Sequence, residues 1–556
     1  MRYRFKGIKT NIDVPMSELP AVTAAKLRIP VSDIMDFEVR RKSVDSRKKP
    51  YIQFVYTVDF SVNKKLRIPK KLSSDISIAD DKSERPLSPA PGSKILGSRP
   101  VVVGMGPAGL FAALELAKAG YRPLVLERGP AMEGRIEAVD RFRKDRVLDP
   151  EANMLFGEGG AGTFSDGKIG TGIKDSLIRE VLKEFRDAGA GDDIMYLAKP
   201  HIGTDVLRTV IVKIREKTES LGGEILFDTK LESLVIEDGR LTAVDIVRKD
   251  ASASERIETD ALILAIGHSA RDTFSMINAS GLCMQQKPFS IGVRMEHPQK
   301  LIDEAQYGRE NIGKLPPADY RINYRASKGR GVYSFCMCPG GEVVVCSTKD
   351  GELCVNGMSN RKRDSGTANS GILCDVRTDD FGSDDVLAGV RFQEKYEKLA
   401  FINGGSDFTA PACSMDAFLS GAPEAAKVTG SLPDFAAEAI REAVPDFARK
   451  IHGYDDPSAV VTAVETRSSS PVRIVRDEHG ESNIKAYTLP VKARVTPEAS
   501  LLPPVTASEL RGTSLNDIVR SSKTCEPGIA QVVAAALVIP VSELTCNIKA
   551  FYEKRL

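Results

Sequence analysis

The chain has 556 residues, of which 42% are hydrophobic and 28% charged, and its net charge is +2. This length suffices for two or three domains, and the composition is that of a globular protein. The balanced charge excludes a chain whose whole surface serves a polyanion. Nine cysteines without a CxxC pair favour a reducing cytoplasm and argue against a structural metal site.

No membrane partner is expected from the sequence. The N-terminal residues lack the apolar core of a signal peptide. The longest apolar stretch, Val532–Val541, is too short to span a bilayer.

Residues 1–72 are expected to form a small α+β domain, with a helix over Ala21–Leu27 and a strand over residues 51–58. Residues 1–71 hold 17 Lys and Arg against 7 Asp and Glu. This excess indicates either a solvated face or a docking surface for RNA or an acidic protein. Residues 73–97 are rich in Ser, Pro, Asp and Lys and are predicted to be a linker.

A dinucleotide-binding unit is predicted over Pro100–Gly129, which read PVVVGMGPAGLFAALELAKAGYRPLVLERG. An apolar strand, a glycine turn, a helix and a second apolar strand follow one another in the order that binds a dinucleotide. The residues expected to contact the cofactor here are Gly104, Gly106, Pro107, Ala108, Gly109, Glu127 and Arg128.

Each conspicuous residue of this unit has an expected task. Gly104 permits the tight turn, and Gly109 lets the helix approach the strand. Gly106 has no side chain to keep a pyrophosphate from the helix N-terminus. Glu127 is placed to accept hydrogen bonds from the adenosine ribose. Arg128 would suit a 2′-phosphate, but Glu127 would repel that group.

A second glycine-dense stretch, residues 151–172, cannot be a helix or strand interior. It is expected to be a loop that approaches a ligand closely, the alternative being a mobile surface loop. Beyond it the pattern predicts a helix over 203–222, a strand over 224–227, a hairpin of 231–237 with 241–248, and a buried strand over Thr259–Gly267.

The strand that ends at Gly267 favours FAD over NAD. A simple nicotinamide dehydrogenase needs only the first glycine turn, whereas a flavoprotein of the glutathione-reductase class returns to the same sheet for such a strand. Gly267 is therefore added to the expected cofactor contacts. From 276 to 455 short strands and turns dominate, with a hairpin of 332–338 and 342–347 around Pro339-Gly340-Gly341 and a helix over Phe435–Ala448.

The chain resembles an uncharacterised bacterial family of FAD-dependent dehydrogenases. The resemblance covers about residues 1–485 and is carried by the following motifs: RKSVDSRKK (Arg41–Lys49), GMGPAGL, FGEGGAGTFSDGK, KPHIGTD, AIGHSARD, KPFSIGVRMEHPQ, YSFCMCPGG and ETRSSSPVRI. It implies a flavoprotein with a two-domain FAD core, a small N-terminal domain and an unassigned substrate. Together with the glycine density, it adds the contacts Gly160, Thr163, Phe164 and Ser165.

The expected fold is therefore α/β. An FAD-binding Rossmann-like domain with a parallel sheet (98–275) carries an inserted, mainly antiparallel α+β domain (276–455), and residues 456–485 return to the FAD domain. The N-terminal α+β domain (1–72) and the linker (73–97) precede them.

Residues 486–556 depart from the family. After Lys485 the family continues GLYPxGEGAGYAGG, whereas this chain reads AYTLPVKARVTPEAS. Restoring one lost G after codon 485 lets suitable codons for Val491–Ala499 read GEGAGYAGG. The hypothesis is a frameshift in the gene or its sequencing. The lost segment should supply amides beside the flavin, so weak or absent flavin is expected in this polypeptide.

No catalytic residue is assigned from the sequence. The candidates are His268 as a proton donor, Cys338, which alternates with Cys336 along a strand, and Arg467 in a cationic run with Ser468, Ser469 and Arg473. Each has a plainer interpretation, respectively a loop histidine, a packing cysteine and a surface loop. His201 is a further candidate near the same pocket.

The expected function is that of an FAD-dependent oxidoreductase, with NAD(P)H as a candidate electron donor and an unknown small-molecule substrate. The alternative is a flavin-binding, non-catalytic or redox-sensing protein whose basic N-terminal domain docks RNA or an acidic protein. The near-neutral charge speaks against nucleic acid, and the oligomeric state is left open.

Overall fold

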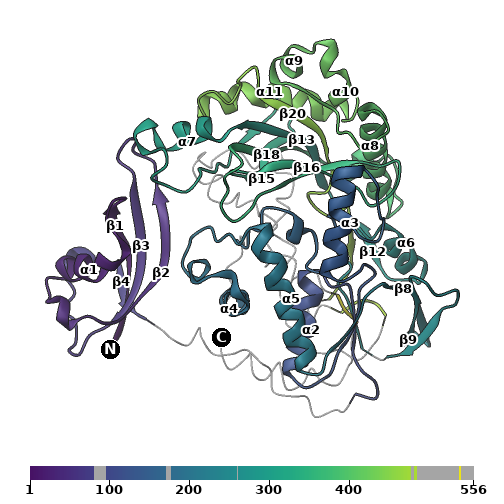
Figure 1. Ribbon diagram of the computed structural model, residues 1–556, viewed down its shortest axis with the longest axis horizontal. Coiled ribbons are helices and arrows are strands. Elements are labelled where there is room, and N and C mark those ends of the chain that lie inside the picture. Colours follow the sequence, from purple (N-terminus) through teal and green to yellow (C-terminus); the bar gives the residue numbers. More distant parts are fainter. Residues whose placement is uncertain (80–95, 171–176, 260, 478–480, 485–536, 540–556) are drawn as a thin grey trace, which may run out of the picture.

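The computed structural model describes residues 1–79, 96–170, 177–259, 261–477, 481–484 and 537–539. A small N-terminal sheet lies to one side, a parallel sheet with helices forms a second body, and a larger antiparallel sheet with its own helices forms the third (Figure 1). The expected α/β class with a parallel sheet is confirmed. The departing segment 486–556 lies outside the described residues apart from Leu537–Ile539.

The N-terminal sheet is antiparallel, in the order β2-β3-β1-β4. Its elements are β1 Arg2–Asn11, α1 Leu19–Leu27, β2 Met35–Asp45, β3 Gln53–Ser61 and β4 Ile76–Ile78. Alternate residues of β3, namely Phe54, Tyr56, Val58 and Phe60, are buried, because successive side chains of a strand point to opposite faces. These side chains form the core of this body.

The predicted linker begins too early. Strand β4 lies inside the range 73–97 and pairs with β1, where Phe5 opposes Ile76 and Tyr3 opposes Ile78. Ile76 is buried against the core of the N-terminal sheet. The strand was not predicted because its surroundings are rich in Ser, Asp and Lys and it buries only one side chain, that of Ile76.

Four parallel strands in the order β7-β6-β5-β11 form the second sheet, with β22 antiparallel beside β11. The strands are β5 Val101–Val103, β6 Leu124–Leu126, β7 Glu224–Leu226, β11 Leu262–Leu264 and β22 Leu537–Ile539. The helices of this body are α2 Pro107–Lys118, α3 Met132–Asp145, α4 Leu177–Phe185 and α5 Thr204–Ser220. The predicted strand 259–267 is shorter in the structure, and α5 matches the predicted helix closely.

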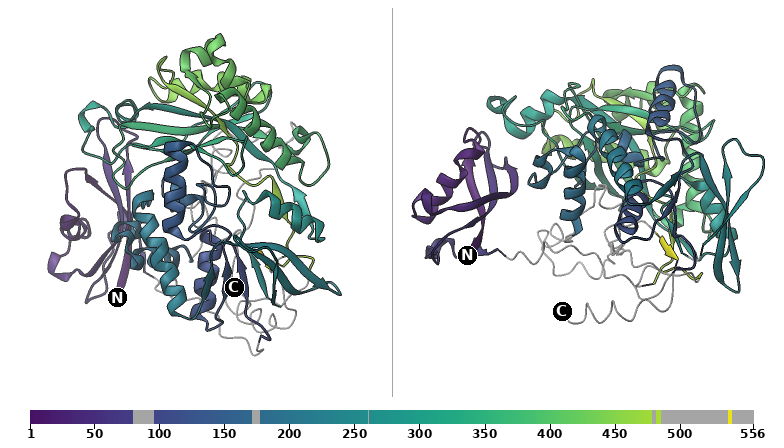
Figure 2. Two further views of the ribbon diagram at one scale, coloured as in Figure 1. Left: turned by 45° about the vertical axis from the view of Figure 1, so that its right-hand side comes forward. Right: turned by 60° about the horizontal axis from the view of Figure 1, so that its bottom comes forward.

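Both faces of this sheet are covered, which explains its unbroken apolar strands. Val102, Val125 and Ile263 pack under α2 and α5, which lie side by side in Figures 1 and 2. The alternate residues, such as Val101 and Leu264, pack on the other side against α6 Arg271–Ala279 and a small sheet. That small sheet consists of β8 Thr229–Glu237, β9 Arg240–Arg248 and β10 Glu255–Glu258. The predicted hairpin is formed by β8 and β9.

The third body is built on a six-stranded antiparallel sheet in the order β14-β15-β18-β13-β20-β19. Its strands are β13 Phe289–Pro298, β14 Asn323–Arg325, β15 Gly331–Cys338, β18 Thr367–Val376, β19 Ala412–Ser414 and β20 Val460–Glu465. The helices are α7 Gln299–Tyr307, α8 Ala388–Gly404, α9 Met415–Ser420, α10 Ala426–Thr429 and α11 Asp434–Lys450. Two-stranded ribbons pair β12 Met284–Gln286 with β21 Val472–Ile474, and β16 Glu342–Cys346 with β17 Cys354–Met358.

The predicted hairpin around Pro339-Gly340-Gly341 is wrong. Strand β15 pairs with β14 and β18, whereas β16 pairs with β17. The amide of Gly340 donates to the Gln299 side chain and that of Gly341 donates to the Thr367 carbonyl. Because these amides bond to other segments, the glycines carry the chain from one sheet to another instead of closing a turn.

The predicted return to the FAD domain at residue 456 is also too early. Strand β20 lies in the six-stranded sheet between β13 and β19. Beyond β20, Ile474 is the first residue that packs on the face of the parallel sheet covered by α6. Ile484 is the next. A short apolar strand such as 460–465 has the same sequence pattern in the parallel and in the antiparallel sheet. The sheet that it joins is therefore set by its hydrogen-bonding partners.

Within the described residues, no helix is long and apolar enough to cross a membrane. The same part of the chain holds no group of three or more His, Cys, Asp or Glu side chains arranged to hold a metal ion.

Candidate functional site

The glycine turn lies at the carboxyl end of β5, where the chain passes into α2. A Cβ on Gly109 would fall 1.8 Å from the Gly104 carbonyl oxygen, and one on Gly104 would fall 2.6 Å from the Ala265 carbonyl oxygen. Gly104 also has a φ of +92°, which side chains disfavour. Both glycines therefore serve close packing of turn, helix and neighbouring strand.

Gly106 is different, because a Cβ added in the space in front of α2 would meet no clash. It is the N-cap residue of α2 and offers no side chain to cap the helix. A Cβ added there would meet nothing closer than Gly160 Cα, 3.8 Å away. The first amides of a helix point outward and attract anions, so this space fits a diphosphate.

The second glycine segment packs directly on the first. The amide of Gly159 donates to the Met105 carbonyl at 2.8 Å, and a Cβ on Gly160 would fall 2.8 Å from Pro107 Cδ. The segment is irregular, as expected, with one 3₁₀ turn over Ala161–Phe164. The loop thus walls the space in front of α2.

The predicted contacts in this loop do not all face that space. Thr163 and Phe164 are buried, and the Phe164 ring lies between the guanidinium groups of Arg135 and Arg208. The Ser165 hydroxyl donates to the Gly357 carbonyl at 3.1 Å. These side chains shape the loop, and cofactor contact through their backbone stays a prediction.

Glu127 lies at the carboxyl end of β6, as the motif requires. Its carboxylate accepts the amide of Met105 at 2.7 Å and that of Gly129 at 2.9 Å. Burial is the largest influence on this group and raises its pKa. Each carboxylate oxygen has a second acceptor direction, so the predicted ribose contact remains compatible with this geometry.

Arg135 was missed by the sequence analysis. Its guanidinium is buried and donates to the carbonyls of Asn153 at 2.9 Å and Glu158 at 2.6 Å. Burial lowers its pKa to about 9, and Nη2 has no hydrogen-bond partner among the described residues. A buried donor without an acceptor is costly, so this atom fits an oxygen of a bound nucleotide. The signal was present, because Arg135 stands on the apolar face of α3 with Met132 and Val139.

Arg128 is held by other protein groups. It donates to Glu151 at 2.5 and 2.8 Å and to Asp272 at 2.9 and 3.1 Å. Its guanidinium also lies over the Phe156 ring. The structure thus gives Arg128 the task of fastening β6 to α6, and its predicted cofactor contact remains untested.

Gly267 and His268 follow β11, which pairs in parallel with β5, so they lie at the same sheet edge as the glycine turn. Gly267 is exposed, and a Cβ there would meet no atom within 4 Å. Burial, then the nearby cations Arg467 and Arg271, lower the pKa of His268 to about 4. Its Nε2 is buried and has no hydrogen-bond partner in the described part of the chain. At neutral pH this imidazole is uncharged.

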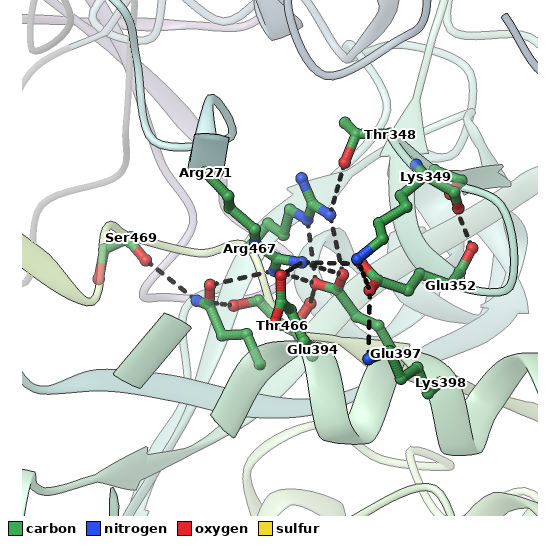
Figure 3. A network of polar contacts seen from close by, with 12 residues as sticks. Arg271, Thr348, Lys349, Glu352, Glu394, Glu397, Lys398, Thr466, Arg467 and Ser469 are labelled. Carbon is green, nitrogen blue, oxygen red and sulfur yellow. Dashed lines mark hydrogen bonds and ion pairs between the residues drawn. The ribbon is translucent and has the colours of Figure 1, made fainter. Parts of the chain in front are cut away.

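Arg467 belongs to a buried ionic network rather than to a free cationic run (Figure 3). Its guanidinium donates to Glu397 at 3.0 and 2.8 Å and to Thr348 at 3.0 Å. Arg271 binds the same carboxylate twice at 2.9 Å. These arginines hold the pKa of Glu397 well below its usual range against the opposing effect of burial. Arg467 thus joins the end of β20 to α8, and Glu397 offsets its charge.

Cys338 is not placed to act as a nucleophile on its own. It is fully buried, its thiol donates to the Cys336 carbonyl at 3.2 Å, and its pKa is raised well above the usual value. His201, the further candidate, lies near Asp166, and burial lowers its pKa to about 4. The fold thus brings His268 and Arg467 together, while Cys338 and His201 lie elsewhere, around Asp166 and Lys168.

Comparison with known proteins agrees with this geometry. A family described as FAD-dependent protein, C-terminal domain-like, matches residues 288–468, an FAD binding domain matches residues 99–139, and a domain of unknown function (DUF8436) matches residues 7–61. An uncharacterized protein of Clostridium beijerinckii is 41% identical over 500 residues, which cover 87% of this chain and 92% of that protein. The chain belongs to this family of FAD-dependent proteins. The predicted FAD-binding domain is confirmed.

Solved structures show only partial likenesses. THI4 of Thermovibrio ammonificans matches 34% of this chain and 66% of its own, at 18% identity and a TM-score of 0.24. A triple mutant of the flavin-dependent brominase Bmp2 matches 55% of this chain and 65% of its own, at 14% identity and a TM-score of 0.29. In both cases this chain spans less than two thirds of the other protein, and neither likeness adds to the assignment.

We expect Glu397→Gln to lower the unfolding free energy by about 3–5 kcal/mol at pH 7, because it leaves Arg467 buried without its anion, whereas Arg271 keeps Glu352 at 3.0 Å. Glu394→Gln, on the same helix and 3.9 Å from Arg271, is the matched control and should cost less than about 1 kcal/mol. Because the pKa of Glu397 is lowered in the folded state, its stabilisation is complete above about pH 5 and is lost as the pH falls. Chemical denaturation at pH 7 and pH 4 measures both effects, and equal losses in the two variants would contradict the network.

We expect the His268 ring resonance to stay unchanged between pH 8 and 5.5, since the pKa of His268 is about 4 and an ordinary imidazole titrates near pH 6.5. The unfolded chain binds this proton near pH 6.5, so His268 also lowers stability as the pH falls below that value. NMR of histidine-labelled protein follows the five histidines, with His268→Gln for assignment and the exposed His452 as reference. A midpoint near 6.5 would show that the imidazole is solvated and not held among cations.

Proposed function

We propose that this protein is an FAD-dependent oxidoreductase with a substrate yet to be assigned. The observation that carries the proposal is the N-terminus of α2, which no side chain caps, with Gly106 in front and the unpartnered Nη2 of Arg135, in a chain of an FAD-dependent family. When bound, the flavin supplies the hydride chemistry. The protein supplies binding, orientation and control of charge.

Different residues of the site bind different parts of the nucleotide. The α2 amides that follow Gly106 hold the diphosphate, because their dipoles point into the same open space. Glu127 accepts a ribose hydroxyl with the acceptor directions that Met105 and Gly129 leave free. Arg135 donates its remaining hydrogens to an oxygen of the same half. Gly267 leaves room beside β11 for the part of the cofactor that extends along the sheet edge.

The alternative, a protein whose basic N-terminal domain binds RNA or an acidic partner, is less well supported. Arg2 pairs with Glu38, Arg4 with Asp59 and Arg47 with Asp45, at 2.6–2.7 Å. Strand β2 also bonds to its own chain, because the Lys42 amide donates to Tyr196 O at 2.7 Å and its carbonyl accepts from Ala198 N at 2.9 Å. Three basic side chains of this domain are thus paired internally, and strand β2 is bonded to another segment of the chain.

The glycine turn can be tested with two alanine variants. In the chain with the reading frame restored after codon 485, Gly106→Ala should weaken FAD binding at least tenfold, because the new methyl group occupies the space of the diphosphate, while thermal unfolding of the FAD-free protein stays unchanged. Gly331→Ala, whose Cβ has its closest contact at 3.6 Å, is the control and should bind like the parent. Quenching of flavin fluorescence gives the affinities. Equal affinities in all three proteins would place the cofactor elsewhere.

The departure after Lys485 gives a second test. We expect this chain to be purified with little or no flavin, and a chain with the reading frame restored after codon 485 to be yellow. Visible absorbance spectra of both proteins measure the occupancy. Full FAD occupancy of the present chain would show that the family's last glycine segment is dispensable.

The reaction is tested on the frame-restored chain. Anaerobic addition of NADH or NADPH should bleach the flavin absorbance, and dithionite gives the spectrum of full reduction as the reference. A bound flavin that dithionite reduces but neither nicotinamide reduces would remove NAD(P)H as donor and leave the binding assignment intact. A chain that binds no FAD would overturn the proposed function itself.

A further inference from the structure

Strand β15 is broken at Cys336. Its register with β18 is regular up to Phe335 opposite Gly371 and resumes at Cys338 opposite Asn369, so the strand is bulged between them. Cys336 has a φ of +42°, which residues with a side chain rarely adopt. Such strain in an otherwise regular strand is found at functional sites, where it directs a side chain.

The bulge brings two thiols of different character together. Cys338 is fully buried, and its thiol donates to the Cys336 carbonyl at 3.2 Å. Cys336 itself is partly exposed. The buried thiol thus lies against the backbone of the partly exposed one.

Charged groups reach this pair from three directions. Lys168, in the second glycine segment, donates to the Met337 carbonyl, and Arg294 on β13 donates to the Cys336 carbonyl at 3.0 Å. Two anions lie nearby as well, Asp166 beside Lys168 and Glu465 on β20.

Each of these anions is held by cations of its own. Glu465 accepts from Arg294 at 2.6 and 3.0 Å. Asp166 accepts from Arg363 at 2.9 Å and from the Ser359 hydroxyl, and His201 lies 3.8 Å away. The Cys338 hydrogen bond together with Lys168 and Arg294 lowers the pKa of the Cys336 thiol, whereas the pKa of Cys338 is raised.

We propose that Cys336 is a nucleophilic thiolate and Cys338 its resolving thiol, and that the pair exchanges with the disulfide of a small thiol compound. The Cys336 thiolate attacks one sulfur of the disulfide RS–SR, which forms a mixed disulfide and releases RS⁻. Cys338 then attacks the Cys336 sulfur, forms the Cys336–Cys338 disulfide and releases RSH. The two protein thiols are oxidised by two electrons, and the substrate disulfide is reduced to two thiols.

The sequence alone speaks against such a bond, because residues two apart on a regular strand are poorly placed for a disulfide. The bulge removes that objection, since Cys336 no longer has strand geometry. A disulfide across one intervening residue closes a small ring and is expected to be strained. Strained disulfides are oxidising and readily reduced again, which suits an exchange site better than a permanent crosslink.

The pair lies next to the second glycine segment. Ser165 of that segment donates to the Gly357 carbonyl at 3.1 Å, and a Cβ on Gly357 would fall 2.8 Å from the Cys338 sulfur. The exchange chemistry needs only the two cysteines and their neighbours. The inference therefore goes beyond the proposed flavin function and stands or falls without it.

Alkylation by iodoacetamide at different pH values tests the thiolate in the full-length chain, with peptide mass spectrometry to assign each cysteine. The rate at Cys336 should fall less than about twofold between pH 8 and pH 6, whereas an ordinary thiol with a pKa near 8.5 slows about 75-fold. The exposed Cys283 is the internal reference. A Cys336 rate that falls in parallel with Cys283, or that is absent at every pH, overturns the proposal.

The cation is tested by Lys168→Met, with Lys199→Met as the matched control because Lys199 pairs with Asp319 on the surface. Lys168→Met should make alkylation of Cys336 more dependent on pH, and Lys199→Met should leave it unchanged. The ultraviolet absorbance of the thiolate, compared with Cys336→Ser, reports the same titration without any reagent. An unchanged profile in Lys168→Met contradicts the assigned role of the cation.

Treatment with 2-hydroxyethyl disulfide tests the resolving thiol. The parent chain should lose two hydrogens and yield a peptide with an internal Cys336–Cys338 disulfide. Cys338→Ser should instead retain the mixed disulfide at Cys336. Modification confined to Cys283, or a mixed disulfide that persists at Cys336 in the parent, would overturn the exchange sequence whether or not the protein binds FAD.

Discussion

The close approach of two glycine segments is the constraint on which the site depends. Gly104 and Gly109 allow strand, turn and helix to touch, and Gly159 bonds to the carbonyl of Met105. Gly160 lies so close to Pro107 that a Cβ on Gly160 would collide with the proline ring. Side chains at these positions would push the loop away from α2. The result is a close junction between the loop and the start of α2, in which the absence of a side chain at Gly106 leaves the α2 amides uncovered by that residue.

Ion pairs, some of them buried, hold the elements around this site in place. Arg128 fastens the end of β6 to α6, and Arg271 with Arg467 shares Glu397 between α6, α8 and the end of β20. Removing these charges from water is unfavourable unless each is paired. The paired arginines therefore stabilise the fold and are not available to bind a ligand. Among the buried nitrogen atoms that have no hydrogen-bond partner in the described residues are Arg135 Nη2 and His268 Nε2. These atoms are the better candidates for contact with a ligand.

The sequence predicts the parts of this protein whose physics is local. The strand–turn–helix–strand unit, the helix α5 and the β8–β9 hairpin follow from apolar periodicity and glycine placement, and the structure contains all three. Partners distant in the chain are not predictable in this way. The strand 342–346 pairs forward with β17, and β20 joins β13 across more than 160 residues. The same limit applies to the site, because nothing local reveals that Arg467 meets Glu397 or that β15 is bulged. Arg135 could have been found from the sequence, since a charged side chain on the apolar face of α3 requires a hydrogen-bond acceptor when it is buried.

The central claim is that the α2 N-terminus and Arg135 hold the diphosphate half of FAD. A crystal structure of this chain with ADP tests it most directly, because ADP requires none of the residues beyond Lys485. The account predicts the diphosphate in front of Gly106, within hydrogen-bond reach of the first amides of α2, and an oxygen of the nucleotide against Arg135 Nη2. A diphosphate bound at any other place, or no ADP at saturating concentration, would contradict it.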